Sequence, residues 1–185
     1  GNLPSNADLE KLVETNSDWI ISRTGIEERH IVEKGQGPSD ILLPAVKMLL
    51  EKRGMSANEI DGIIVGTTTP DMVFPSVACM LQEKLGITNS FCYDVQAACS
   101  GFLYALSTGA MMIEAGRYKK ILICGADGMS SIVDYQDRAT CIIFGDGAGC
   151  VLLEASEEPN VGVLDMIIRA DGSGREYLHM KAGGS

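Results

Sequence analysis

The chain has 185 residues, of which 45% are hydrophobic and 22% charged, and its formal net charge at pH 7 is −10. This composition is typical of a folded soluble domain and excludes a disordered chain. The negative charge argues against nucleic acid and against anionic membrane surfaces as partners, because both require a basic surface. No apolar run approaches the roughly 18 residues of a spanning helix, and the polar start has no signal-peptide pattern. We therefore expect a cytoplasmic protein.

The first third of the sequence predicts two helices. Asn6 is a good cap for the first helix, and an apolar stripe at helical spacing follows it. After a polar stretch around residues 34–38, a second helix is expected to run to about Arg53, because Gly54 is a natural helix end.

The rest of the chain alternates strands and helices. A continuous apolar strand at 62–66 precedes a helix that Ser76 caps and Gly86 ends, and a helical segment to about residue 115 follows a short strand. We expect strands at 62–66, 91–95, 121–126, 141–144, 149–154 and 163–169. This order predicts an α/β layered fold with a mostly parallel sheet and antiparallel strands at its end.

The helix expected at 102–115 has almost no polar face. Its sequence, FLYALSTGAMMIEA, is apolar or small on nearly every side, so we expect it to be buried all round. This chain has little material to cover both sides, which suggests that another domain or subunit does so.

The cysteines lie at 79, 92, 99, 124, 141 and 150, and there are only two histidines. No pair has Cys-x-x-Cys spacing, so we expect no metal site and free thiols in a reducing compartment. Four of the six lie in apolar runs and should be buried, and Cys99 is the exception. It stands where a strand turns into a helix, and the N–H groups at a helix start stabilise a thiolate and a developing oxyanion. Position alone fits an acyl-accepting nucleophile or a structural thiol.

Four ordered blocks carry a resemblance to a known family. QAACSGFLYAL is similar to the active-site motif of β-ketoacyl-acyl-carrier-protein synthase III, a condensing enzyme of the thiolase superfamily. The other three blocks resemble further signatures of that family and span nearly the whole chain: NADLEKLVETNSDWIISRTGIEERH, FPSVACMLQEKLGI and DRATCIIFGDGAGCVLLEASEEP.

The resemblance implies roles for individual residues. Cys99 matches the nucleophile that accepts an acyl group from acyl-CoA, which is a substrate, and no cofactor is implied. The matches to the family's CoA-binding residues are Trp19, Arg23, Thr24 and Arg138. Phe74 matches a residue that reaches across a homodimer into the partner's acyl pocket. The other pocket walls match Met129, Ile143 and Phe144.

Several of these residues also have structural interpretations. Trp19 could be a packing residue, and Arg138 could pair with Asp134 or Asp137. The glycine-rich segment 145–149 lacks the Lys and Ser/Thr of a phosphate loop, so we interpret it as a turn near the active site. We expect His30 to be solvated and assign no role to His179.

The family's chemistry also uses a His and an Asn, and neither histidine of this chain matches that His. We therefore interpret residues 1–185 as the amino-terminal, nucleophile-bearing half of a thiolase-like fold, an αβαβα sandwich in the full enzyme. The carboxyl-terminal half is expected to lie outside the chain, and most of the family's first strand to be missing before GNLP.

The implied activity initiates fatty-acid synthesis by condensing a short acyl-CoA with malonyl-acyl carrier protein through an acyl-Cys99 intermediate. The alternatives are a polyketide-priming or other thiolase-superfamily condensing enzyme, and a non-catalytic scaffold half.

Overall fold

The computed structural model describes residues 4–183, so the expectations about the two chain ends fall partly outside the described residues. Its centre is a four-stranded sheet in the order β2-β1-β3-β4. β1 pairs in parallel with both β2 and β3, whereas β3 and β4 are antiparallel. The predicted mixed, mostly parallel sheet is therefore confirmed, with strand bounds β1 Gly62–Gly66, β2 Phe91–Val95, β3 Lys120–Gly128 and β4 Asp146–Glu154.

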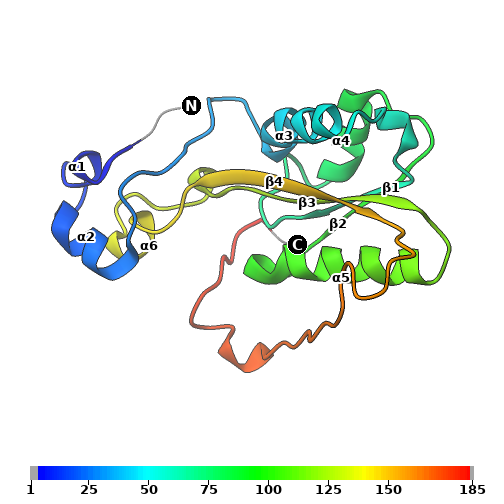
Figure 1. Cartoon of the computed structure of the whole chain (residues 1–185). Coiled ribbons are helices and arrows are strands. Elements are labelled where there is room, and N and C mark those ends of the chain that lie inside the picture. Colours follow the sequence, from blue (N-terminus) through cyan, green and yellow to red (C-terminus); the bar gives the residue numbers. More distant parts are fainter. Residues whose placement is uncertain (1–3, 184–185) are drawn as a thin grey trace.

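Helices cover both faces of this sheet (Figure 1). α3 (Pro38–Arg53) and α4 (Val77–Leu85) lie on one face, and α5 (Gly101–Glu114) lies on the other. β1 is buried along its whole length because it is the inner strand of the parallel part. Its side chains alternate between the two faces, so Ile63 packs in the core under α3 and α4, and Ile64 packs against the core under α5. This explains why its sequence is apolar at consecutive positions.

The predicted boundaries of α3 and α4 have local causes. The Ser76 side chain accepts a hydrogen bond from the Cys79 backbone N–H at 3.1 Å, as expected of a helix cap. Gly54 and Gly86 end the two helices in the left-handed conformation, with φ of 62° and 69°. Asp94 of β2 also accepts from two N–H groups at the start of α4, which ties that helix to the edge strand.

A second group of short helices lies beyond one end of the sheet (Figure 1). It contains α1 (Asn6–Leu9), α2 (Ser17–Thr24) and α6 (Arg138–Cys141). Leu9, Ile20, Cys141 and Ile142 form its buried core. Arg29 is also buried here and donates to the Asn6 side chain at 2.6 Å and to the Ile142 carbonyl at 2.5 Å. This group therefore joins segments that are more than a hundred positions apart in the chain.

Some expected elements differ from the structure. The first helix begins at Asn6 as predicted but ends after one turn, and α2 was not predicted. The apolar run 141–144 is no strand: it ends α6 and enters a turn, because its side chains Cys141 and Ile142 pack against α1 and α2. β4 starts at Asp146, so 146–149 lies within a strand. The predicted strand at 163–169 is irregular and mostly exposed.

The remaining helices are short 3₁₀ turns: η1 Ala57–Glu59, η2 Ala98–Ser100, η3 Met129–Ser131 and η4 Gly172–Gly174.

α5 packs against the sheet through Ala105 and Gly109, which are buried. On its other side Ser107 is also buried, but Leu103 and Met111 are each 57% exposed. Within this chain α5 is therefore not buried all round, which agrees with the expectation that the chain has too little material to cover both of its sides. Among residues 4–183, no helix has the length and apolarity needed to cross a membrane.

Candidate active site

Cys99 lies at the turn between β2 and α5, where the sequence placed it. It belongs to η2, is exposed, and is followed by the buried Gly101 at the start of α5. Ala98 has a φ of +46°, in the left-handed region that residues with a side chain rarely occupy. Such strain persists only where surrounding contacts hold the backbone in place. The turn therefore presents the thiol to solvent at a helix start, and we call residues 96–101 the cysteine elbow.

Two glycines allow β1 and α5 to meet beneath the elbow. A Cβ added to Gly66 would lie 2.5 Å from the Gly101 carbonyl carbon and 2.7 Å from the Phe102 nitrogen. A Cβ added to Gly101 would lie 3.3 Å from the Gly66 Cα. The end of β1 and the first turn of α5 are thus in backbone contact, and a side chain at Gly66 would separate them.

The amino-terminus of α5 carries no side-chain cap. Ser100 precedes the helix without a hydrogen bond from its side chain to the first turn, and no acidic residue lies in that turn. The N–H groups at a helix start have no intrahelical partner and carry partial positive charge. Here, however, the Gly101 N–H donates to the Ala98 carbonyl and the Ser100 N–H donates to the Ala97 carbonyl, so η2 already pairs both groups. The positive end of the α5 dipole still favours a thiolate or a developing oxyanion at Cys99.

The other cysteines lie in less reactive surroundings. Cys124 and Cys141 are buried, and Cys79, Cys92 and Cys150 are half-buried. Burial raises the pKa of the thiols of Cys92, Cys124, Cys141 and Cys150, in the case of Cys124 well above its usual value. A raised pKa lowers the fraction of reactive thiolate at neutral pH. Cys99 is the one exposed cysteine of the six.

A polar cluster stands beside the elbow. Three consecutive threonines, Thr67–Thr69, follow β1, and Asp127 lies near the end of the adjacent strand β3. One Asp127 oxygen, Oδ1, accepts from all three threonine hydroxyls and from two of their backbone N–H groups. These residues are not among the site residues that the sequence predicted. The usable signal was a polar run and an acidic residue at the carboxyl ends of neighbouring parallel strands, which lie at one edge of the sheet.

The residues matched to a CoA site meet at the group of short helices. The Arg138 guanidinium lies 4.9 Å from the centre of the Trp19 ring, and that of Arg23 lies 5.8 Å from it. Arg138 also donates to the Glu14 carbonyl at 3.1 Å. Asp137 instead accepts from Ala139 and Thr140 of α6. The Arg138 contacts are therefore with Trp19 and Glu14 rather than with either neighbouring aspartate.

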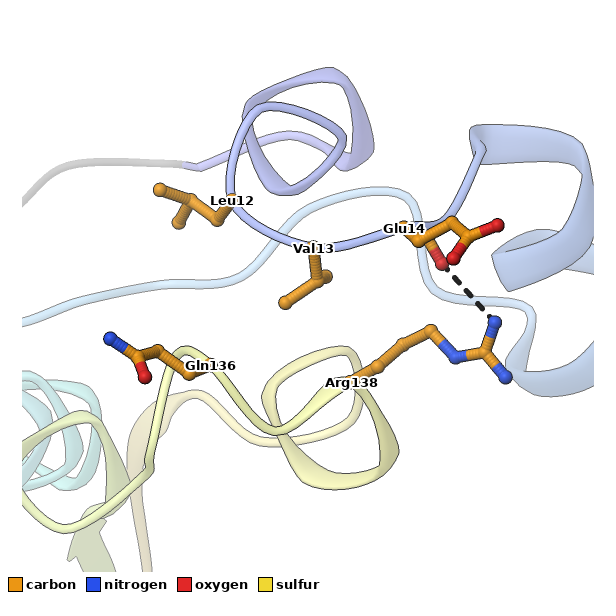
Figure 2. Close-up of a pocket in the computed structure, with 5 residues that line it drawn as sticks. All are labelled: Leu12, Val13, Glu14, Gln136 and Arg138. Atoms are coloured by element: carbon orange, nitrogen blue, oxygen red, sulfur yellow. Dashed lines mark hydrogen bonds between the residues drawn. The ribbon is translucent and has the colours of Figure 1, made fainter.

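An open pocket adjoins this cluster (Figure 2). It has a volume of about 540 Å³ and is lined by Leu12, Val13, Glu14, Gln136 and Arg138. Figure 2 shows that Arg138 reaches across from α6 toward the Glu14 backbone. Thr24, the fourth matched residue, uses its hydroxyl locally: it donates to the Ile20 carbonyl at 2.8 Å and accepts from the Ile26 N–H at 3.0 Å.

The residues matched to acyl-pocket walls lie on two segments. Phe74 is 82% exposed on the loop before α4. Met129 directly follows β3, and Ile143 and Phe144 precede β4 by only a few residues. Because Gly128 pairs with Asp146, Met129 and residues 143–144 lie at the same end of the β3–β4 ladder. Ile143 is 47% exposed, and Met129 and Phe144 are half-buried.

Comparison with known proteins supports the resemblance. Residues 93–172 match the family model of 3-oxoacyl-[acyl-carrier-protein] synthase III. A β-ketoacyl-[acyl-carrier-protein] synthase III of Koribacter versatilis is 57% identical over 182 residues, which is 98% of this chain and 55% of the relative.

Solved structures agree. The β-ketoacyl-[acyl-carrier-protein] synthase III of Thermus thermophilus superposes with a TM-score of 0.91 at 36% identity, over 96% of this chain and 55% of that one. The chain is homologous to β-ketoacyl-[acyl-carrier-protein] synthase III. The predicted family resemblance and thiolase-like α/β fold are confirmed. The chain spans about half the length of the synthase III relatives that it matches.

A priming β-ketosynthase from the R1128 polyketide pathway also matches. Its TM-score is 0.81 at 32% identity, over 85% of this chain and 47% of that one. A synthase III and a priming ketosynthase of a polyketide pathway therefore share this fold.

Proposed function

We propose that this chain is the nucleophile-bearing half of a β-ketoacyl-acyl-carrier-protein synthase III and that Cys99 accepts the acyl group. The observation that carries the proposal is the placement of Cys99: an exposed thiol at the uncapped start of α5, in a chain whose other cysteines are buried or half-buried. The sequence similarity to synthase III supports the same assignment. The protein is then an acyltransferase of fatty-acid synthesis.

The first stage is transfer of a short acyl group from acyl-CoA to Cys99. The thiolate attacks the thioester carbonyl carbon, and a carbon–sulfur bond to Cys99 forms as the carbonyl oxygen becomes negative. The positive end of the α5 dipole stabilises that charge. The bond to the CoA sulfur then breaks, CoA leaves as its thiolate, and acyl-Cys99 remains.

The proposed CoA site is the cluster around Trp19. Trp and Arg faces stack on a nucleobase, and Arg23 and Arg138 offer positive charge to phosphate. Arg138 lies 4.9 Å from the centre of the Trp19 ring, closer than the roughly 7 Å, two contact distances of about 3.5 Å, that a base stacked between two planes would need. Binding between them therefore requires Arg138 to leave the Glu14 carbonyl, and Thr24 would line the path of the pantetheine arm.

The second stage joins malonyl-acyl carrier protein to the acyl group. Loss of carbon dioxide leaves a carbanion that attacks the acyl-Cys99 carbonyl, a carbon–carbon bond forms, and the bond to the Cys99 sulfur breaks. The family's His and Asn stabilise that carbanion, and neither His30 nor His179 matches the His. We therefore infer that this stage uses the other half of the fold.

The same proposal covers the acyl pocket and the quaternary structure. Met129, Ile143 and Phe144 would line the acyl pocket, and the exposed Phe74 would enter the pocket of a second copy in a cytoplasmic homodimer. Analytical ultracentrifugation of the parent chain and of the Phe74→Ser variant tests this. The parent should sediment as a dimer, and the variant should dimerise more weakly.

Intact-mass spectrometry after incubation with acetyl-CoA tests the acylation stage. The parent chain should gain one acetyl group, Cys99→Ser should gain none, and the control Cys150→Ala should behave as the parent. An adduct that persists in Cys99→Ser would refute the assignment of the nucleophile. A folded parent without any adduct would support the scaffold alternative.

A polyketide-priming role is the second candidate, and the structural match to the R1128 priming ketosynthase favours considering it. Competition among acetyl-, butyryl- and branched-chain acyl-CoA for Cys99 distinguishes the two roles. A strong preference for acetyl-CoA supports fatty-acid initiation, whereas preference for a larger primer supports the polyketide pathway.

A further inference from the structure

The environment of Asp127 is unusual because five donors surround one oxygen. The donors lie between 2.7 and 3.2 Å from Oδ1 and comprise the hydroxyls of Thr67, Thr68 and Thr69 and the backbone N–H groups of Thr68 and Thr69. A carboxylate oxygen offers about two lone-pair directions, so this number exceeds what individual bonds can satisfy. The negative charge itself therefore organises the threonine loop, which we define as Thr67–Thr69.

The threonine loop is joined directly to the cysteine elbow. The Thr67 N–H donates to the carbonyl of Val95, the last residue of β2, at 3.2 Å. On the other side, Gly66 immediately precedes the loop and touches the backbone of Gly101 at the start of α5. Val95, which directly precedes the elbow, therefore bonds to the threonine loop, and Gly101, the last residue of the elbow, contacts the residue that precedes the loop.

A third contact closes the arrangement on β3. The Thr69 hydroxyl accepts from the Gly128 N–H at 2.8 Å while it donates to Asp127. Asp127 is half-buried and lies two residues beyond the position of β3 that pairs with Gly66. It therefore lies opposite the threonine loop, with β1 between it and the strand that leads to Cys99.

We propose that Asp127 is the positioning residue of the cysteine elbow. It acts through the threonine loop, which bonds to Val95 and directly follows Gly66, the residue that contacts Gly101. These contacts hold Cys99 in a fixed relation to the start of α5. Ala98 needs such support, because its φ of +46° is unfavourable without it. Asp127 does not touch the reacting atoms in this scheme, and its effect on acyl transfer rests on the function proposed above.

Backbone amide exchange tests the proposal without acyl chemistry. Asp127→Asn keeps the shape of the side chain and removes its charge. We expect the amides of Thr67 and Ser100, which do not bond to Asp127, to exchange at least tenfold faster in this variant, because charged hydrogen bonds are the strong ones.

Asp61→Asn is the matched control. Asp61 accepts from the N–H groups of Lys119 and Lys120 at 2.7 and 2.9 Å. It lies at the amino-terminal ends of β1 and β3, whereas Asp127 lies at their carboxyl-terminal ends. Removing the Asp61 charge should accelerate exchange at the Lys119 and Lys120 amides and leave the Thr67 and Ser100 amides at the parent rate. If Asp127→Asn leaves Thr67 and Ser100 unchanged, or accelerates all four amides alike, the positioning role is wrong.

Acylation provides the second measurement. With acetyl-CoA, Asp127→Asn should lower the saturating rate of Cys99 acylation at least tenfold and leave the half-saturating concentration within twofold, because the CoA cluster lies on other elements. A rise in the half-saturating concentration alone would contradict the proposal. If the folded parent does not acylate, the proposed function fails, and the exchange experiment still decides the role of Asp127.

A milder pair of variants covers the case in which Asp127→Asn does not fold. Thr68→Val removes one hydroxyl that donates to Asp127 at 3.0 Å, and Thr68→Ser retains it. Exchange at Thr67 and Ser100 should accelerate in the valine variant and return to the parent rate in the serine variant. Equal exchange in the two variants would overturn the proposal.

Discussion

Replacing Gly66 with alanine tests the closest backbone approach at the cysteine elbow. The new Cβ would lie 2.5 Å from the Gly101 carbonyl carbon, where ordinary contact begins at 3.4 Å. β1 and α5 must therefore separate by about 1 Å to admit it. The opposing atoms belong to the backbone and cannot rotate away as a side chain could.

The cost follows from this geometry. Overpacking a tight site costs about 1–3 kcal/mol, and we expect the upper part of this range, about 2–3 kcal/mol, because backbone atoms are opposed. For a chain of this size each kcal/mol lowers Tm by roughly 2–4 °C, so the expected decrease is about 4–12 °C. A displacement of about 1 Å at a reacting group can also lower the acylation rate by about 100-fold.

Urea and thermal unfolding followed by circular dichroism measure the stability, and intact-mass kinetics with acetyl-CoA measure the acylation. Gly147→Ala is the matched control, because Gly147 lies in β4 and a Cβ there has nothing within 4 Å. Its stability should stay within about 0.5 kcal/mol of the parent. If Gly66→Ala is as stable as Gly147→Ala and keeps the parent acylation rate, the contact between β1 and α5 does not position the elbow.

Three further predictions concern charge and thiol chemistry. After brief iodoacetamide treatment at pH 8, peptide mapping should find Cys99 modified before Cys92, Cys124, Cys141 and Cys150, because burial raises the pKa of those four thiols. Equal labelling of all five in the folded protein would contradict this. Arg138→Ala should raise the half-saturating acetyl-CoA concentration about 5–10-fold, through loss of roughly 1 kcal/mol of stacking and charge, and leave the saturating rate unchanged. The hydrogen bond from Lys84 lowers the pKa of Asp40 below its usual 3.8. Stability from this pair is therefore present above that value and lost as pH falls through the lowered pKa. Lys84→Met should destabilise the chain at pH 7 and match the parent in acid unfolding below that pKa.

Local sequence signals predicted the parts of the fold that depend on neighbours in the chain. Ser76 and Gly86 bound α4 where a cap and a left-handed glycine were expected, and the apolar strands at 62–66 and 91–95 are β1 and β2. The placement of Cys99 at a strand-to-helix turn was predicted for the same reason, because the turn lies within one short segment.

The errors have two causes: one segment depends on distant partners, and one helix had local signals that were not used. Residues 141–144 are apolar enough for a strand, but Cys141 and Ile142 pack with Leu9 and Ile20, which are more than 100 positions away. α2 was missed although Asn16 accepts from the Trp19 N–H at 2.8 Å and Gly25 ends the helix with a φ of 70°. These are ordinary boundary signals, so in this case the information was local and was overlooked.

The proposed role of Asp127 illustrates a dependence that only the sheet order reveals. Asp127 follows Thr67 by 60 positions in the chain, yet the two bond because β1 and β3 are parallel neighbours. The sequence predicts both strands but not that β1 lies between β2 and β3, and this order decides which loops meet. With β1 central, the loop that follows it must lie between the end of β2, which leads to Cys99, and the end of β3, which carries Asp127. In the proposed scheme a carboxylate on β3 therefore acts on Cys99 through that loop, and its partners are the threonine hydroxyls and N–H groups rather than Cys99 itself.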